Sequence, residues 1–197
     1  MKKETLIENI ENLTPKEKEI LTKLFKNRED IGLAELINEI KESWKDSGEK
    51  EAYIRLLNRL HNFFGKIMED VNKSWKQSLY ELEVASDLIK ASKYSASAFH
   101  SQQAVEMGLK AFYIYCNADV MHEHNLFKMA KTMGLPDSII QKSSKLNPIY
   151  TRTRYFDARA DGKIPAEQFD EGQADEYYNY AEEILRWLSE KLNLSMD

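Results

Sequence analysis

The sequence has little that would end a helix and nothing that would cross-link the chain. Seven Gly and four Pro occur among 197 residues, and so few turn-forming residues argue against hairpins and short strands. A single cysteine, Cys116, excludes a disulfide within the chain. No apolar run approaches the roughly 18 residues that a membrane span needs. We therefore expect no membrane contact and a cytoplasmic location.

The charge is also modest. Lys and Arg total 28 and Asp and Glu total 33, which gives a net charge of −5. A broad, sequence-independent grip on nucleic acid depends on a basic surface that neutralises phosphates, and no such patch dominates the sequence. What is present is a succession of amphipathic segments with helical period, which predicts an all-α protein.

The segment from Ser95 to Cys116 predicts a long central helix, because it contains no Pro and one Gly. Two largely apolar rows run along it at steps of three and four residues: Ala98, Gln102, Val105, Leu109, Phe112 and Cys116 in one, and Ala104, Met107, Ala111 and Ile114 or Tyr115 in the other. Two rows predict contacts on most sides of the helix, and we expect Cys116 to be buried. The narrow polar strip carries Gln103, Glu106 and Lys110.

Residues 1–70 predict a helical extension. The sequence Thr14-Pro15-Lys16-Glu17 has the spacing of a capping box at a helix start. Two further amphipathic segments follow, the second ending at about Asp70. Three short helices in a row also suggest a helix-turn-helix reader, but the third has no clear basic face, so we favour a helical appendage to the main domain.

The second region, residues 71–197, predicts a bundle. A helix over 71–91 and a three-residue turn lead into the central helix, which indicates an antiparallel hairpin. A shorter helix is expected from Asn125 to Met133, and another around residues 139–150 that Pro148 bends or divides. Residues 156–169 predict an irregular loop, and a last helix follows from about Asp170 to Leu192.

Three motifs in this second region carry a resemblance to a known family. They are Gln102, Gln103, Ala104 and Glu106 in the central helix, the His-Asn-Leu sequence at 124–126, and Tyr150, Thr153, Arg154, Tyr155, Phe156 and Asp157, with Phe156 where a Pro is usual. In their order and spacing they resemble the HEPN family (higher eukaryotes and prokaryotes nucleotide-binding). The resemblance implies an up-and-down bundle of four or five helices that assembles as a homodimer.

The resemblance leaves the activity open. The resemblance implies one possible activity, because many HEPN proteins look like ribonucleases that need no metal. These use an Arg followed four to six residues later by His. Here His124 is the last histidine, so Arg152 and Arg154 have no such partner. Metal-free RNA cleavage needs a group that exchanges protons near neutral pH, which Arg does not do. We therefore predict no catalytic residues and no cofactor.

The resemblance implies a candidate phosphate or nucleotide site at Arg152, Arg154 and Tyr155, with Glu106 as their partner and His124 nearby. The structural alternative is that Arg154 only pairs with Glu106 or Asp157. A metal at His122 and His124 is not favoured, since only Glu123 offers a third ligand. We expect His100 to be a hydrogen-bonded interior or interface residue.

Three functional hypotheses follow. The favoured one is a nucleotide- or RNA-associated module without robust catalysis, which works with a small nucleotidyltransferase in a toxin-antitoxin-like system. The second is a divergent ribonuclease that uses His100 or His124 in place of the missing histidine. The third is a purely structural or interaction subunit.

Overall fold

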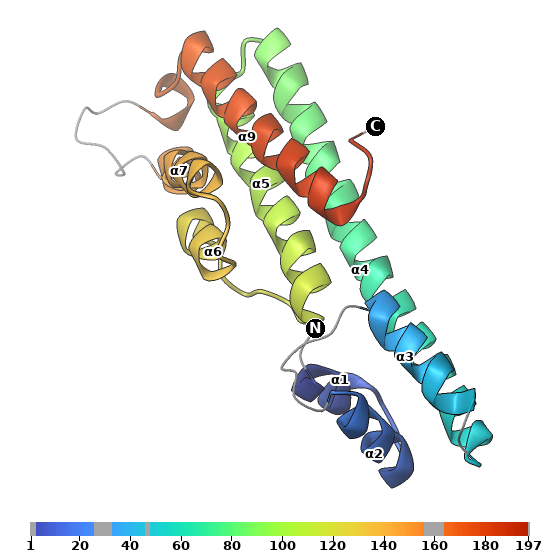
Figure 1. The fold of residues 1–197 in the computed structure, drawn as a ribbon. Helices are drawn as coiled ribbons and strands as arrows, with labels where there is room; N and C mark the ends of the chain where they lie inside the picture. The colour runs from blue at the N-terminus through green and yellow to red at the C-terminus, as the bar shows by residue number, and fades with distance from the viewer. Residues whose placement is uncertain (1–2, 26–32, 46–47, 156–163, 197) are drawn as a thin grey trace. The chain divides into compact units, whose positions relative to one another are not determined.

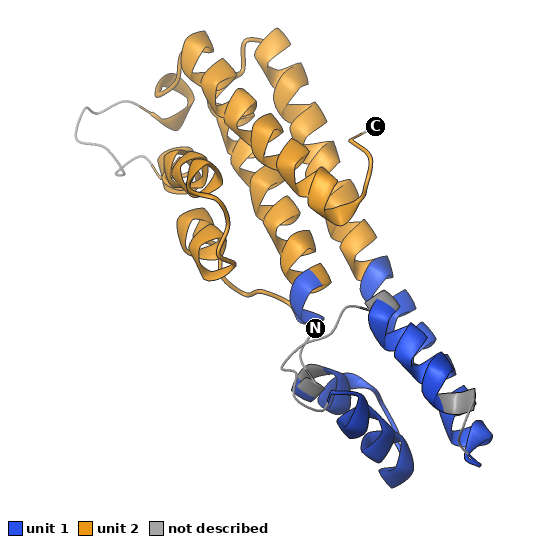
Figure 2. Ribbon diagram, in the orientation of Figure 1, with its two compact units in different colours: residues 1–69, 116–119 blue, residues 70–115, 120–197 orange. Residues whose placement is uncertain are grey.

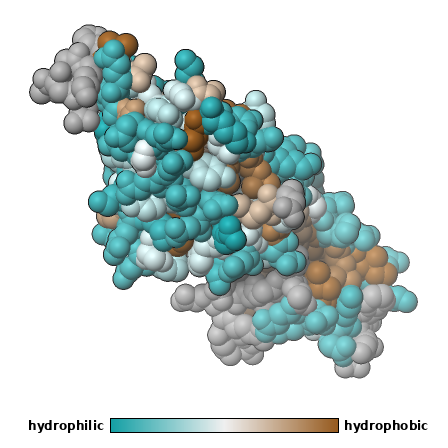
Figure 3. All heavy atoms as spheres, turned by 90° about the horizontal axis from the view of Figure 1, so that it is seen from above, coloured by the Kyte–Doolittle hydropathy of each residue, from teal (hydrophilic) through white to brown (hydrophobic). Residues whose placement is uncertain are grey.

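The computed structural model describes residues 3–25, 33–45, 48–155 and 164–196. Every regular element in these ranges is a helix (Figure 1), which confirms the all-α class. None of the described helices has the length and apolarity needed to cross a membrane. The face shown in Figure 3 is mostly hydrophilic, with hydrophobic residues in smaller groups, as expected where each helix buries one face.

The chain divides into two compact units (Figure 2): unit 1 comprises residues 1–69 and 116–119, and unit 2 comprises residues 70–115 and 120–197. The helices of unit 1 are α1 (Lys3–Asn9), α2 (Pro15–Leu24), α3 (Leu33–Lys45) and the first part of α4 (Lys50–Lys90). Unit 2 holds the rest of α4, most of α5 (Tyr94–Asn117), α6 (Leu126–Thr132), α7 (Asp137–Leu146), α8 (Ile149–Arg152), the 3-10 turn η2 (Pro165–Glu167) and α9 (Glu171–Leu192).

Helix α4 corrects one expectation. The sequence pattern predicted two helices that meet near residue 70, but the structure has one helix of 41 residues. Between Lys66 and Lys90 there is no Pro or Gly, so nothing ends the helix there. The buried positions of α4 continue at helical spacing from Leu56 and Leu60 through Val71, Trp75 and Leu82, so one helix accounts for both segments.

Unit 1 is organised around the start of α2. The predicted capping box is confirmed: the Thr14 side chain accepts from the backbone of Glu17, and the Glu17 carboxylate accepts from the Thr14 backbone at 2.7 Å. Glu17 is fully buried, with Arg55 and Arg59 of α4 at 3.5 and 3.4 Å. Around them lies an apolar core: Leu6, Ile10, Leu13, Ile20, Leu21, Phe25, Leu36, Ile40, Ala52, Tyr53, Leu56 and Leu60.

In unit 2, α4 and α5 form the expected antiparallel hairpin. The Ser74 hydroxyl donates to the Met107 carbonyl at 2.8 Å, and the Ser78 hydroxyl donates to the Ala104 carbonyl at 2.7 Å. The two bonds run in opposite order along the helices and so fix their register.

Helix α9 lies close against the same hairpin. A Cβ built on Gly108 would clash with a side-chain methyl group of Leu185, so the absence of a side chain at this position lets α5 and α9 approach closely. The indole of Trp75 donates to the carbonyl of Ser195 at 2.8 Å and holds the segment after α9 against α4.

The shorter elements also follow the sequence. Asn125 caps α6 through a bond from the Lys128 backbone, Asp170 caps α9, and Pro148 separates α7 from α8 as expected. Most of the predicted loop at 156–169 lies outside the described residues. The expectation for Cys116 was wrong, because it is exposed at the end of α5.

Candidate functional site

The polar strip of α5 contains a buried carboxylate. Glu106 is 3% exposed because α5 is covered on most sides. Its carboxylate accepts from Lys110 Nζ at 2.9 Å and from Gln102 Nε2 at 3.3 Å, and lies 2.8 Å from His124 Nδ1. We call Glu106, Lys110 and His124 the α5 ion-pair cluster.

The cluster keeps Glu106 ionised. Burial raises the pKa of Glu106, but the hydrogen bonds from Lys110 and His124 outweigh it and bring the pKa below its ordinary value of 4.5. A buried charge is stable only when it is paired and hydrogen-bonded in this way. The carboxylate of Glu106 and the ammonium of Lys110 therefore neutralise each other largely within the unit.

His124 is the exposed member of the α5 ion-pair cluster. Its side chain is 69% exposed, and its position is set by Glu123, which accepts from the backbone of His124 at 2.9 Å and of Asn125 at 3.0 Å. These bonds lead the chain into α6. Nδ1 of His124 is directed at the Glu106 carboxylate, so Nε2 is the ring nitrogen that is turned away from Glu106.

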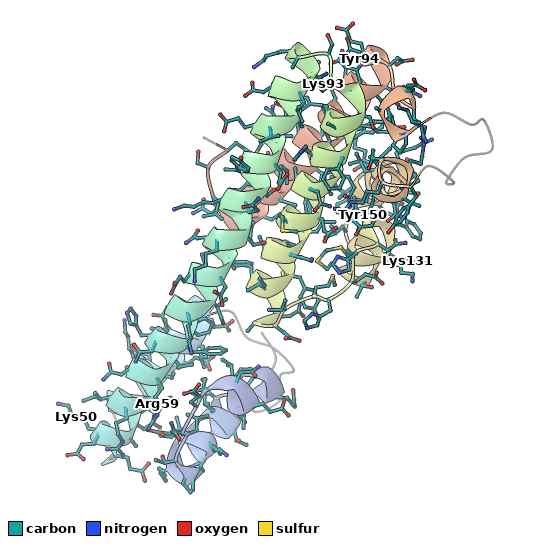
Figure 4. All side chains as sticks on the ribbon, turned by 180° about the vertical axis from the view of Figure 1, so that it is seen from behind. Lys50, Arg59, Lys93, Tyr94, Lys131 and Tyr150 are labelled. Atoms are coloured by element: carbon teal, nitrogen blue, oxygen red, sulfur yellow. The ribbon has the colours of Figure 1, made fainter. Side chains whose placement is uncertain are left out.

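Arg154, just after α8, has different surroundings. Its Nη1 donates to the hydroxyl of Tyr150 at 2.7 Å. The guanidinium carbon lies 4.2 Å from the ring centroid of Tyr150, which is labelled in Figure 4, and 4.7 Å from that of Phe99. Both distances are typical of cation-π contacts. These contacts hold the guanidinium plane without cancelling its charge.

Arg154 and Phe99 line a cleft of about 540 Å³. The cleft is bordered by the start of α5, the end of α8 and the η2 turn: Ser95, Ala96, Phe99, Thr153, Arg154, Ile164, Pro165 and Ala166. A volume of this size suits a small ligand. We call it the Arg154 cleft.

Arg152 and Tyr155 lie on either side of Arg154 in sequence. The guanidinium of Arg152 lies 4.6 Å from the ring centroid of Phe169, and Tyr155 is 52% exposed. Arg152 thus also contacts an aromatic face, and Tyr155 offers an exposed ring close to the cleft in sequence.

The five predicted site residues therefore fall into two groups, one in the α5 ion-pair cluster and one, Arg152, Arg154 and Tyr155, in or next in sequence to the Arg154 cleft. Glu106 and His124 belong to the α5 ion-pair cluster, and no ion pair among the described residues joins Glu106 to Arg154. Asp157, the other proposed partner of Arg154, lies outside the described residues. The sequence reasoning missed Phe99 and Tyr150 as contacts of Arg154, although Tyr150 lies four residues before Arg154 in a helical segment and such residues face each other.

The histidine of α5, His100, makes a hydrogen bond across the α4–α5 contact, as expected. His100 Nδ1 lies 2.6 Å from the Glu81 carboxylate of α4, and both side chains are partly buried. Its ring also lies edge-to-face against Phe99, with 5.3 Å between centroids. His100 thus joins the α4–α5 contact to the aromatic wall of the Arg154 cleft.

The fold and these motifs define a helical-bundle protein of one family. The HEPN domain model matches residues 71–192, and the chain belongs to the HEPN family. The fold is similar to that in the crystal structure of TT1696 from Thermus thermophilus, with a TM-score of 0.58 and 23% identity over 61% of this chain and 97% of that chain.

A second solved structure is ST0689, described as an archaeal HEPN homologue. It has a TM-score of 0.55 and 28% identity, and the match covers 62% of this chain and 97% of that chain. No curated protein matches the sequence. The similarity therefore identifies the family of the chain and confirms the HEPN-like bundle.

Proposed function

We propose that the Arg154 cleft binds the phosphate of a nucleotide or of RNA, and that the chain is a nucleotide- or RNA-associated module without robust catalysis. The observation that carries the proposal is the position of Arg154. Its described contacts are two aromatic rings and a phenol oxygen. None of these groups is an anion, so no carboxylate among the described residues cancels the charge that would bind a phosphate.

The chemistry of the cleft suits this ligand class. A guanidinium with a fixed plane offers paired donors to phosphate oxygens. Aromatic side chains such as Tyr155 can stack with bases without regard to their sequence. Arg152 supplies a second guanidinium, positioned over Phe169. Two cations and an exposed ring within four residues fit a nucleotide better than a purely apolar ligand.

We expect no robust catalysis because the groups that line the cleft do not include a suitable base. Cleavage of RNA without metal needs a base that accepts a proton near neutral pH, and Arg154 cannot act as one. His124 has its Nδ1 on Glu106, in the α5 ion-pair cluster. Within residues 71–192, which match the HEPN domain model, no arginine is followed by a histidine, so the family's Arg-then-His arrangement is not present there.

A divergent ribonuclease is the second candidate, and the observation that favours it is the position of His100. The contact between His100 Nδ1 and Glu81 resembles the carboxylate-histidine pairs that orient general bases, and Nε2 is then the nitrogen that would accept a proton. His100 also contacts Phe99, which lines the cleft. This candidate predicts cleavage that depends on both His100 and Arg154.

Labelled single-stranded RNA in EDTA distinguishes the two candidates. Binding is followed by fluorescence anisotropy and cutting by gel electrophoresis, with Arg154→Ala compared with Arg186→Ala, an exposed arginine of α9. We expect intact RNA and an affinity at least about tenfold weaker for Arg154→Ala, a loss of about 1.4 kcal/mol. Equal affinity of Arg154→Ala and wild type would contradict the proposal, and reproducible cutting lost in His100→Ala would establish the ribonuclease.

The proposed partner is a small nucleotidyltransferase in a toxin-antitoxin-like system, as the family resemblance implies. Co-purification of the chain with such an enzyme would support this proposal. If the complex forms while the chain alone binds neither nucleotide nor RNA, the third hypothesis, a purely interacting subunit, describes the protein better.

A further inference from the structure

Unit 1 has a cleft of its own, beside the turn that follows α1. Its volume is about 420 Å³, which suits a small ligand. The end of α1 with its turn and one face of α4 border it: Asn9, Ile10, Glu11, Asn12, Arg59, Asn62, Phe63 and Lys66. The four α4 residues follow each other at steps of three, one and three, so they share a helix face. All eight residues belong to unit 1, and we call this cavity the unit 1 cleft.

Arg59, labelled in Figure 4, is held at the edge of the unit 1 cleft by two contacts. Its Nη1 donates to the carbonyl oxygen of Glu11 at 3.1 Å, and its Nε lies 3.4 Å from the buried carboxylate of Glu17. That carboxylate also lies 3.5 Å from Arg55, so one negative charge faces two guanidinium groups. A guanidinium has five N–H donors, and these contacts use at most two. Arg59 therefore offers donors in fixed positions to a ligand.

Glu11 and Lys66 bring opposite charges to the same cleft. Both side chains are exposed, and neither forms an ion pair with the other or with any residue that the structure describes. An anion alone would be repelled by Glu11, and a cation alone would be repelled by Lys66. A ligand that carries both an ammonium and a carboxylate pairs with both residues.

Three asparagines supply neutral hydrogen-bonding groups between these charges. Asn9 and Asn12 come from the α1 side of the cleft, and Asn62 comes from α4. Each amide has an oxygen that accepts and an NH₂ group that donates. The cleft can therefore hydrogen-bond an ammonium and a carboxylate of the same ligand.

Phe63 and Ile10 give the cleft an apolar surface. The ring of Phe63 packs against the unit 1 core and lies edge-to-face against Phe64, with 5.4 Å between centroids. Ile10, on the α1 side, is 5% exposed. An apolar or aromatic side chain of a ligand would gain hydrophobic contact here.

We infer that the unit 1 cleft binds a free α-amino acid with an apolar side chain. Lys66 and Arg59 bind its carboxylate, Glu11 binds its ammonium group, and Phe63 contacts its side chain. The site uses neither the Arg154 cleft nor the α5 ion-pair cluster, so it stands independently of the proposed function.

Calorimetric titration of the full chain with L-phenylalanine, L-leucine and L-tryptophan tests the inference. We expect binding of at least one of them. The amide of that amino acid lacks the carboxylate and its N-acetyl form lacks the ammonium, so each should bind at least about tenfold more weakly. If wild type binds none of the three at concentrations up to about 10 mM, the inference is wrong.

Two variants assign the charges of the ligand to residues of the cleft. Lys66→Met should bind the amino acid at least about tenfold more weakly and should no longer discriminate against the amide. Glu11→Gln should no longer discriminate against the N-acetyl form. The control is Lys18→Met, which removes an exposed lysine of α2 and should bind like wild type. Circular dichroism confirms that each variant remains helical.

The outcomes separate this site from the proposed function. Arg154→Ala should bind the amino acid like wild type. An amide and an N-acetyl form that bind as well as the amino acid would show an apolar contact only and would overturn the inference. It would also be overturned by ATP binding that is lost in Lys66→Met, because the cleft would then take a phosphate.

Discussion

The α5 ion-pair cluster and the Arg154 cleft lie in the same unit and both hold cationic side chains, but the cations are held in different ways. Lys110 and His124 contact a carboxylate that is 3% exposed. Arg154 contacts the faces of Phe99 and Tyr150 and the Tyr150 hydroxyl. The first arrangement places a positive charge beside a buried anion, and the second places a positive charge beside two aromatic rings and a phenol oxygen.

This difference shows how to separate structural from binding cations in a small helical protein. A carboxylate cancels most of the electrostatic field of the cation that it pairs with, so a phosphate that approaches this cation is only weakly attracted. An aromatic face orients a guanidinium without cancelling its charge. The kind of contact, and not the number of contacts, therefore indicates which cation is available to a ligand.

The largest expected effect is the loss of stability in Glu106→Gln. The amide keeps the shape of the side chain but removes the charge that Lys110 and His124 stabilise. Because the side chains of Lys110 and His124 both reach solvent, we expect a cost of about 2 kcal/mol, or about 4 to 8 °C in Tm for a chain of this length. Thermal and urea denaturation followed by circular dichroism measure it.

The matched control is Glu190→Gln on the exposed side of α9, which should change stability by less than about 0.5 kcal/mol. If Glu106→Gln were as stable as this control, the α5 ion-pair cluster would not be structural. The contrast between cations held by a buried carboxylate and the arginine held by aromatic rings in the Arg154 cleft would then not be supported.

Acid should remove the same stabilisation. The pKa of Glu106 is lowered in the folded protein, so its contribution is present at pH values above about 4.5 and is lost as the pH falls through the lowered pKa. Wild type and Glu106→Gln should therefore differ at pH 7 and converge as the pH falls through the lowered pKa of Glu106. Urea denaturation at several pH values measures the convergence, and a difference that stays constant with pH would contradict it.

The smallest expected effect is that of His124→Ala. His124 is 69% exposed, and Glu106 retains its bond from Lys110 at 2.9 Å. We expect a loss of at most about 0.5 kcal/mol in the same urea experiment. A loss as large as that of Glu106→Gln would mean that His124, and not Lys110, carries the α5 ion-pair cluster.

Much of the fold could be predicted because its signals are local. The capping box at Thr14, the long run free of Pro around Gln102 and the division at Pro148 each act within a few residues, and each is confirmed. The continuity of α4 past Asp70 was not predicted. The two amphipathic segments were read as separate helices, although no Pro or Gly occurs between Lys66 and Lys90 to end a helix there.

The site was less predictable because it depends on which side chains meet across elements. The sequence supplies Glu106 and Arg154 as opposite charges, which suggested a pair. Their real neighbours are set by packing: His124 reaches Glu106 from the segment before α6, and Phe99 reaches Arg154 from α5. Of these contacts, the pairs Glu106 to Lys110 and Tyr150 to Arg154 lie four residues apart and could be predicted from helical spacing.

A titration of ATP into three proteins tests the central claim most directly, namely that the Arg154 cleft binds phosphate and the α5 ion-pair cluster does not. The proteins are wild type, Arg154→Ala and His124→Ala, with affinity measured by calorimetry in EDTA. We predict that Arg154→Ala binds at least about tenfold more weakly than wild type, about 1.4 kcal/mol, and that His124→Ala binds like wild type. Normal affinity in Arg154→Ala together with weakened affinity in His124→Ala would contradict the account.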